Sequence, residues 1–289
     1  MKALWLVSFR PIGKSRSTDL NQSIFVDSIK KIRFDVTFSL TQFGEKNVKE
    51  FIDNKKIKNF YTNISKKQLP TNKKYSNKIM LANALNQFIE NENFDYLIYS
   101  TADIVVPNNL FEVLSGINKK EFCALIYPNI HITNEKVKSN FWPHYGIDLI
   151  VFKLKKENAL KFKNLIENYN QFDWGIIENF YVSMCELLNL KIFNLFKKCK
   201  VLKHDNDPKT FIEDRNWQIK SWKENQKYFL NFLNENNLSK FYAYGSYYYL
   251  LYKILNFRDL NLALTLSYII FYPLNIFKKI LNLVTKNFR

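Results

Sequence analysis

Short apolar runs and helical spacings of hydrophobic residues take turns along the first hundred residues. The run Ala3–Phe9 is almost wholly apolar and predicts a buried strand, and Ile24, Phe25, Ile29 and Ile32 then recur at helical spacing. Further patterns of these two kinds predict strands at 35–40, 57–63 and 94–100 and helices at 46–54 and 77–91. Such alternation favours an α/β fold with a mostly parallel sheet and helices on both faces.

The same two patterns continue to about residue 207. They predict a helix from about 109, strands at 122–127 and 145–152, a helix at 156–169, a turn at 172–175, a helix at 177–190, and short strands at 191–195 and 200–203. From about 214 the pattern is helical. We therefore expect one domain at 1–207 and a helical extension at 208–289. Ligands of such sheets bind beyond the carboxyl ends of the strands, where residues 10–16 and 101–103 lie.

Composition agrees with a folded domain of this size. The chain has 289 residues, of which 47% are hydrophobic and 17% aromatic, and this excludes a disordered protein. Cys123, Cys185 and Cys199 are widely spaced and form no CxxC pair, which favours reduced thiols in a cytosolic protein. His131 and His144 have no partner at metal-ligand spacing, and we interpret them as ordinary loop histidines.

The formal charge of +17 favours an anionic partner: nucleic acid, a nucleotide or an acidic membrane. No RNP, zinc-finger or basic-zipper pattern occurs, so the charge does not indicate dedicated nucleic-acid binding. Lys, Asn, Ile and Phe dominate the whole composition, so part of the charge reflects compositional bias. The charge alone therefore does not assign a function.

The segment 95–103, with Pro107 behind it, is a buried strand that ends in Thr101-Ala102-Asp103. It resembles the fourth-strand signature of the GT-A glycosyltransferases, in which a strand ends in an acidic DxD motif whose carboxylates hold a divalent cation on the diphosphate of a nucleotide-sugar. Here Thr101 replaces the first acidic residue. The resemblance implies that Thr101, Ala102 and Asp103 bind the donor and that Asp103 binds Mn²⁺ or Mg²⁺. One carboxylate alone is a poor site for these ions, and the alternative is a strand-capping Asp in a turn.

Two further segments match the donor side of this family. Asn77 and Lys78 precede the signature strand, as does the stretch that lies along the donor in the family. Ser8, Arg10 and Lys14 lie where the first strand of the fold meets the nucleotide, and a cationic loop there can screen a diphosphate. The alternative for Arg10 and Lys14 is a solvated basic loop.

The strand at 145–152 is similar to one found in many GT-A relatives, and its Asp148 is a candidate contact to the donor or acceptor sugar. A cap or a core hydrogen bond is the alternative for this residue. His204 follows the last strand, where a His of the family often completes the metal or diphosphate site. An imidazole is a credible partner for the ion that Asp103 cannot hold alone, whereas a surface turn before Pro208 is the alternative.

The segment 173–178 resembles the acceptor-side loop and helix start that carry the base in inverting members of the family. An acceptor hydroxyl must lose its proton as it attacks, and a carboxylate suits that task. We predict Glu178 as the base, with Asp173 as second choice, and Trp174 as a flat surface on which a sugar ring stacks. A carboxylate at a helix N-terminus is also simply stabilising, which is the alternative for Glu178.

The extension differs from the rest of the chain. Residues 241–252 form a Tyr-rich block, residues 261–277 carry no charge, and Lys278, Lys279 and Arg289 are among the basic residues that follow. This combination predicts a helix that lies in the interface of an anionic membrane. The alternatives are helices packed against the catalytic domain or a homodimer partner, and a transmembrane span.

Together these patterns predict a glycosyltransferase that moves a sugar from a nucleotide-sugar to a capsular or lipooligosaccharide glycan or glycolipid. Residues 1–10 have too short an apolar run for a signal peptide, so we expect a cytoplasmic protein, peripheral on the inner face of a bacterial membrane. One alternative transfers another phosphate-activated group to the same glycan. Another is a non-catalytic, nucleotide-binding scaffold at the membrane.

Overall fold

A computed structural model shows how these elements are arranged. It describes residues 2–9, 12–13, 16–32, 35–41, 50–51, 54–55, 60–64, 77–90, 94–126, 128–133, 136–139, 149–168, 177–195, 201–204 and 215–238. The strands are β1 Lys2–Ser8, β2 Asp35–Thr41, β3 Phe60–Ile64, β4 Tyr96–Thr101, β5 Ile104–Val105, β6 Phe122–Ile126, β7 Pro128–Thr133, β8 Lys136–Ser139, β9 Leu149–Lys153, β10 Lys191–Asn194 and β11 Val201–His204. The helices are α1 Arg16–Lys30, α3 Asn77–Glu90, α4 Leu110–Ser115, α5 Lys156–Asn168, α6 Ile177–Leu187 and α8 Arg215–Glu235.

The central sheet has seven strands in the order β10-β6-β9-β4-β1-β2-β3. β1 runs parallel to β2 and β4, β2 to β3, and β6 to β10. β9 is antiparallel to both of its neighbours, β4 and β6, so every other strand points the same way. This arrangement confirms the predicted α/β fold with a mostly parallel sheet.

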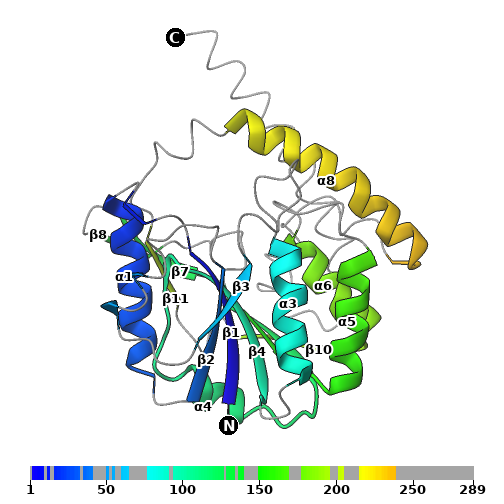
Figure 1. Ribbon diagram of the computed structural model, residues 1–289, viewed down its shortest axis with the longest axis horizontal. Coiled ribbons are helices and arrows are strands. Elements are labelled where there is room, and N and C mark those ends of the chain that lie inside the picture. The colour runs from blue at the N-terminus through cyan, green and yellow to red at the C-terminus, as the bar shows by residue number, and fades with distance from the viewer. Residues whose placement is uncertain are drawn as a thin grey trace.

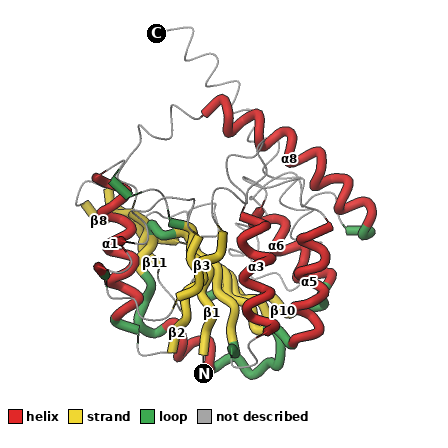
Figure 2. Tube along the Cα trace, viewed as in Figure 1, coloured by secondary structure: helices red, strands yellow, loops and turns green. Residues whose placement is uncertain are grey.

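Helices cover both faces of the sheet, as the alternation predicted (Figure 1). Successive residues of a strand point to opposite faces, and in β1 Leu4 and Leu6 lie in one core while Trp5 and Val7 lie in the other. The first core also contains side chains of α3, α5, α6 and α8, and the second contains side chains of α1 and α4. Figure 2 shows the strands between α1 on one side and α3, α5 and α6 on the other.

A second sheet of four strands has the order β5-β11-β7-β8, and three of its strands, β5, β7 and β8, were not expected. His131, interpreted from the sequence as a loop histidine, lies in β7 and is the register partner of Lys203 in β11. The interpretation as a loop histidine is therefore wrong. Ile130 and Ile132 alternate with polar residues, which is the period of a strand.

Several predictions fall outside the described residues. Among them are His144, Cys199, the boundary near 207 and the proposed membrane-interface segment at 241–289. Within the described part of the chain, no helix is both long enough and apolar enough to cross a membrane. α8, at the start of the extension, packs on α6: the rings of Phe229 and Phe232 lie 6.4 and 5.2 Å from that of Phe180, centroid to centroid.

Candidate active site

The parallel strands of the central sheet end at one edge, here called the carboxyl edge, and begin at the opposite amino edge. β1 ends at Ser8 and β4 ends at Thr101, and the register makes these two residues neighbours. Ala102 and Asp103 follow directly in the chain. Four of the residues predicted to bind the donor therefore lie at the carboxyl edge, at or just after the ends of the adjacent strands β1 and β4.

The turn after β4 lies beside the end of β11. β5 pairs with β11 in antiparallel fashion, with Ile104 opposite Lys203 and Val105 opposite Leu202. Continuing this register by one residue in each strand brings His204 opposite Asp103. The sequence separates these two residues by about a hundred positions, and the pairing of the two strands brings their backbones together.

Asn77 and Lys78 occupy the first two positions of α3. This helix leads into β4, whose start is fixed at the amino edge by a hydrogen bond of 2.8 Å from the backbone N–H of Asp95 to the carbonyl of Lys2. α3 therefore begins at the carboxyl edge and runs back along the sheet. Both predicted donor residues lie on the same side of the molecule as Asp103.

Glu178, the predicted base, is the second residue of α6. The strand that follows this helix, β10, begins at Lys191 beside Phe122, the first residue of β6, so α6 ends at the amino edge and begins at the carboxyl edge. Tyr181 of α6 packs edge-on against Tyr99 of β4, with ring centroids 5.5 Å apart. This contact fixes the first turns of α6 near the end of β4.

Thr101 has a buried hydroxyl oxygen that makes no hydrogen bond within the described residues. The preceding residue differs, because the Ser100 hydroxyl accepts a hydrogen bond of 2.8 Å from the Trp5 indole N–H. Asp103 also has a buried carboxylate oxygen, Oδ1, and is only partly exposed. An unsatisfied buried hydroxyl is costly unless a ligand or water completes it, so Thr101 is suited to contact a bound molecule.

The backbone adds positive potential at this edge. α1, α3 and α6 all begin there, and the N-terminus of a helix carries a partial positive charge that favours anions. Gly13, in the basic loop after β1, has a φ of 85°, which glycine adopts without strain. Its N–H donates to both carboxylate oxygens of Asp19, at 3.1 and 3.0 Å, and this ties the loop to the first turn of α1.

Five predicted site residues lie outside the described residues: Arg10, Lys14, Asp148, Asp173 and Trp174. Within the described ranges, no three His, Cys, Asp or Glu residues come together as a metal site would require. The described candidates for a cation are the pair Asp103 and His204, one carboxylate and one imidazole. Such a pair suits an ion that takes its remaining ligands from a substrate's phosphate oxygens.

Sequence reasoning missed a residue that supports the turn at 101–106, in which Asp103 lies. Ser28 of α1 accepts a hydrogen bond from the backbone N–H of Val106, at 3.1 Å. The signal was present in the sequence, because Ser28 falls on the apolar face formed by Phe25, Ile29 and Ile32. A hydroxyl on such a face needs a buried partner.

Comparisons with known proteins add the fold type. No protein-family model matches the sequence, and no curated protein matches it. The structure is similar to a Staphylococcus aureus TarS fragment in complex with UDP-GlcNAc, with a TM-score of 0.51 at 13% identity over 89% of this chain and 72% of that chain. The fold is GT-A-like.

Two other solved structures have TM-scores below 0.5. One is 4-diphosphocytidyl-2C-methyl-D-erythritol synthase from Anaerococcus prevotii, with a TM-score of 0.42 at 9% identity over 72% of this chain and 90% of that chain. The other is a Drosophila galactosyltransferase complex with manganese, UDP-Gal and xylobiose, with a TM-score of 0.38 at 14% identity over 67% of this chain and 64% of that chain. At 13% identity the TarS comparison establishes the fold alone.

Proposed function

We propose that the protein is a glycosyltransferase that moves a sugar from a nucleotide-sugar to a glycan or glycolipid, such as a capsular or lipooligosaccharide precursor. The observation that carries the proposal is the β5–β11 register, which brings His204 opposite Asp103, beside the Thr101 hydroxyl that has no hydrogen-bond partner among the described residues. A fold shared with TarS, whose solved structure contains UDP-GlcNAc, supports a nucleotide-sugar as the donor.

Asp103 and His204 would hold Mn²⁺ or Mg²⁺ together with the donor diphosphate. Such a cation, when bound, offsets the negative charge that develops on a diphosphate leaving group. Ser8, Asn77, Lys78, Thr101 and Ala102 would line the donor. Arg10 and Lys14 would add positive charge near the phosphates, in the same sense as the helix N-termini at this edge.

Glu178 would act as the general base on the acceptor. It would take the proton of the acceptor hydroxyl while that oxygen forms a bond to the anomeric carbon, and the bond from this carbon to the diphosphate would break with its electron pair leaving on the diphosphate. Asp173 is the second choice for this role. Trp174 would stack against a sugar ring, and Asp148 would hydrogen-bond a sugar hydroxyl.

The acceptor would be reached at a membrane. We propose that residues 241–289 lie in the interface of the inner face of the cell membrane, so that the enzyme works from the cytoplasm on a membrane-linked glycan. The Tyr-rich block and the basic residues after 277 support this proposal, because aromatic side chains favour the membrane interface and lysines favour anionic lipid.

A thermal-shift screen of UDP-, GDP-, CMP- and TDP-sugars, with and without Mn²⁺, tests the donor class. A ligand that binds the native state raises its melting temperature, so we expect one family of nucleotide-sugars to do so. Asp103→Ala should abolish this shift and the release of free nucleotide. Glu112→Ala, which removes an exposed carboxylate on α4, should leave both unchanged. If no nucleotide-sugar raises the melting temperature under either condition, the proposed function is wrong.

A further inference from the structure

We propose that Ser28 is a positioning residue that holds Asp103 in its place for donor binding, through a buried hydrogen bond to the turn that carries Asp103. The turn, residues 101–106, is here called the Asp103 turn. The inference rests on the proposed function, because it assigns Ser28 a part in donor binding. Ser28 lies on α1, whose apolar side chains belong to the same core as Trp5, and it acts through the backbone of Val106.

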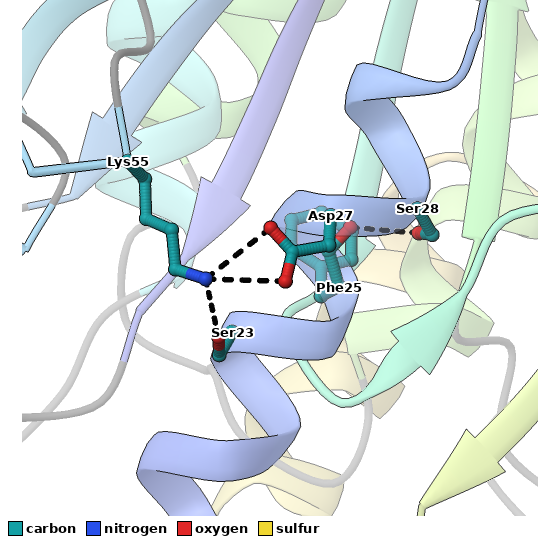
Figure 3. A network of polar contacts seen from close by, with 5 residues as sticks. All are labelled: Ser23, Phe25, Asp27, Ser28 and Lys55. Carbon is teal, nitrogen blue, oxygen red and sulfur yellow. Dashed lines mark hydrogen bonds and ion pairs between the residues drawn. The ribbon is translucent and has the colours of Figure 1, made fainter.

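The hydrogen bonds of Ser28 have a fixed direction. Its hydroxyl donates its one proton to the carbonyl of Phe25, at 2.7 Å, within the same helix (Figure 3). The oxygen then accepts the N–H of Val106, at 3.1 Å. Ser28 is only 7% exposed and Val106 only 2% exposed, so water cannot easily replace either group. Removal of the hydroxyl would leave the Val106 N–H buried without an acceptor.

A second buried hydrogen bond holds the chain just before the turn. The Trp5 indole N–H donates to the Ser100 hydroxyl, at 2.8 Å. Ser100 and Val106 lie three residues before and three residues after Asp103. The Phe25 ring, whose residue accepts from Ser28, packs edge-on against the Trp5 ring at 6.3 Å. Both hydrogen bonds therefore belong to one packed cluster, and they bracket Asp103.

α1, which carries Ser28, is itself held in place by several contacts. Phe25 is fully buried and also packs against Phe9 with ring centroids 6.1 Å apart. On the same helix Asp27 forms an ion pair with Lys55, at 3.1 Å, and Ser23 accepts a hydrogen bond from the same ammonium group (Figure 3). These contacts fix α1 to both the sheet and the segment after β2.

Within the turn, the neighbours of Asp103 are the groups that are fixed. Ala102 and Ile104 are buried, at 6% and 0% exposure, and Ile104 and Val105 pair with β11. Asp103 lies between these fixed neighbours, so a shift of either neighbour would also move Asp103. A misplacement of about 1 Å in a reacting or binding group can lower rates by about a hundredfold.

The test compares Ser28→Ala with Ser183→Ala. Ser183 is also fully buried on a helix and makes the same bond within it, from its hydroxyl to the Phe180 carbonyl at 2.8 Å. Among the described residues its hydroxyl accepts no backbone N–H from another element. The pair of variants therefore separates the loss of the Val106 contact from the loss of a buried helical serine.

Two measurements are made on the full-length chain. The first is amide hydrogen exchange of residues 101–107 without any ligand. The second is the affinity for UDP-GlcNAc, or for the nucleotide-sugar that stabilises the wild type most, as a function of Mn²⁺ concentration. For Ser28→Ala we expect faster exchange in this segment, an affinity about tenfold lower and a higher Mn²⁺ requirement. Ser183→Ala should match the wild type in all three.

Unchanged exchange at 101–107 in Ser28→Ala would overturn the inference, as would faster exchange with unchanged affinity and Mn²⁺ requirement. If Ser28→Ala does not fold, Ser28→Cys is measured in place of Ser28→Ala, because cysteine keeps a small acceptor at this position. A wild type that binds no nucleotide-sugar overturns the proposed function and with it the role in donor binding, whereas the exchange measurement still decides whether Ser28 holds the turn.

Discussion

The two edges of the central sheet differ in how their polar groups are satisfied. At the amino edge the backbone N–H of Lys2 donates to the Asp95 carboxylate, at 2.8 Å, and the Lys2 ammonium lies 3.6 Å from Asp35. Glu121 accepts the backbone N–H of Lys155, at 2.9 Å, just before α5 begins. These carboxylates have partners from the chain itself, and they tie loops and helix ends to the sheet.

At the carboxyl edge the Asp19 carboxylate also has a partner from the chain, the Gly13 N–H, but Thr101 differs. The Thr101 hydroxyl is buried and has no hydrogen-bond partner among the described residues, and the register sets His204 opposite Asp103. Three helices also begin there with their positive ends. The polar groups of the amino edge therefore serve stability, whereas the carboxyl edge also has polar groups and positive potential that are available to a ligand. Substitutions that are matched across the two edges can test this distinction.

The largest effect is expected on turnover, from a comparison of two glutamates at opposite ends of α6. Glu178 begins this helix at the carboxyl edge, and Glu186 lies exposed near its other end. Glu178→Gln should lower kcat by about a hundredfold or more, since a general base contributes about 10²- to 10⁴-fold. Glu186→Gln should stay within about twofold of the wild type. The measurement is nucleotide release in the presence of acceptor, and equal rates for the two variants would mean that the edges do not differ in this respect.

The next largest effect is expected on stability, when the adjacent hydroxyls of Ser100 and Thr101 are removed in turn. Ser100→Ala should destabilise the fold by about 1–3 kcal/mol, because the buried indole N–H of Trp5 loses its acceptor. Thr101→Val should be neutral or slightly stabilising, because it removes a buried hydroxyl that has no described partner. Urea unfolding measures both. A loss of stability in Thr101→Val as large as that in Ser100→Ala would show that the Thr101 hydroxyl serves the fold.

A smaller effect is expected at the amino edge. Glu121→Ala removes the acceptor for the Lys155 N–H and for the Asn158 side-chain amide, at 2.9 and 2.8 Å. Loss of such a hydrogen bond at a helix start should cost about 1 kcal/mol. Thermal or urea unfolding gives the change in stability, and turnover should remain that of the wild type. Reduced turnover at full occupancy of the folded state would contradict the separation of the two edges.

The smallest effect concerns two buried thiols near the amino edge. Burial, and then the neighbouring Cys185, raise the pKa of the Cys123 thiol well above its usual range. The folded state therefore keeps the proton at a pH at which the unfolded chain has lost it, so the stability from this group is complete below a pH of about 8.5 and declines as the pH rises further. The free energy of unfolding of the wild type should fall more steeply between pH 8 and 10 than that of Cys123→Ala. Parallel slopes would show that the thiol does not contribute.

Much of the sheet could be predicted from local pattern. β1 is buried over residues 3–7 and β4 over residues 96–100, and apolar runs indicated both strands. The direction of β9 could not be predicted, because a strand buried on both faces has the same apolar run whichever way it points. β7 and β8 were missed although Ile130 and Ile132 alternate with polar residues, and only two residues separate the two strands. That spacing is typical of a hairpin.

The candidate site was predicted only as a set of positions. Thr101, Asp103 and His204 were predicted because the ends of two apolar strands resemble the motifs at these places in the GT-A family. That His204 lies opposite Asp103 depends on the pairing of β5, a strand of two residues that leaves no periodic signal. The place of Ser28 on an apolar helix face indicated that its hydroxyl needs a buried partner, but no local pattern could identify that partner, Val106, which lies 78 positions further along the chain.

The reversed direction of β9 has a consequence for how such a protein can diversify. β6 ends at Ile126 and β9 begins at Leu149, and these two residues are partners in adjacent strands. The chain between them therefore leaves and re-enters the sheet at points about 5 Å apart. A segment anchored in this way can change in length without a shift of β6 or β9, but it also contains β7 and β8, and β7 pairs with β11. Variation within residues 127–148 would therefore leave the central sheet intact and act on β11, whose pairing with β5 sets His204 opposite Asp103.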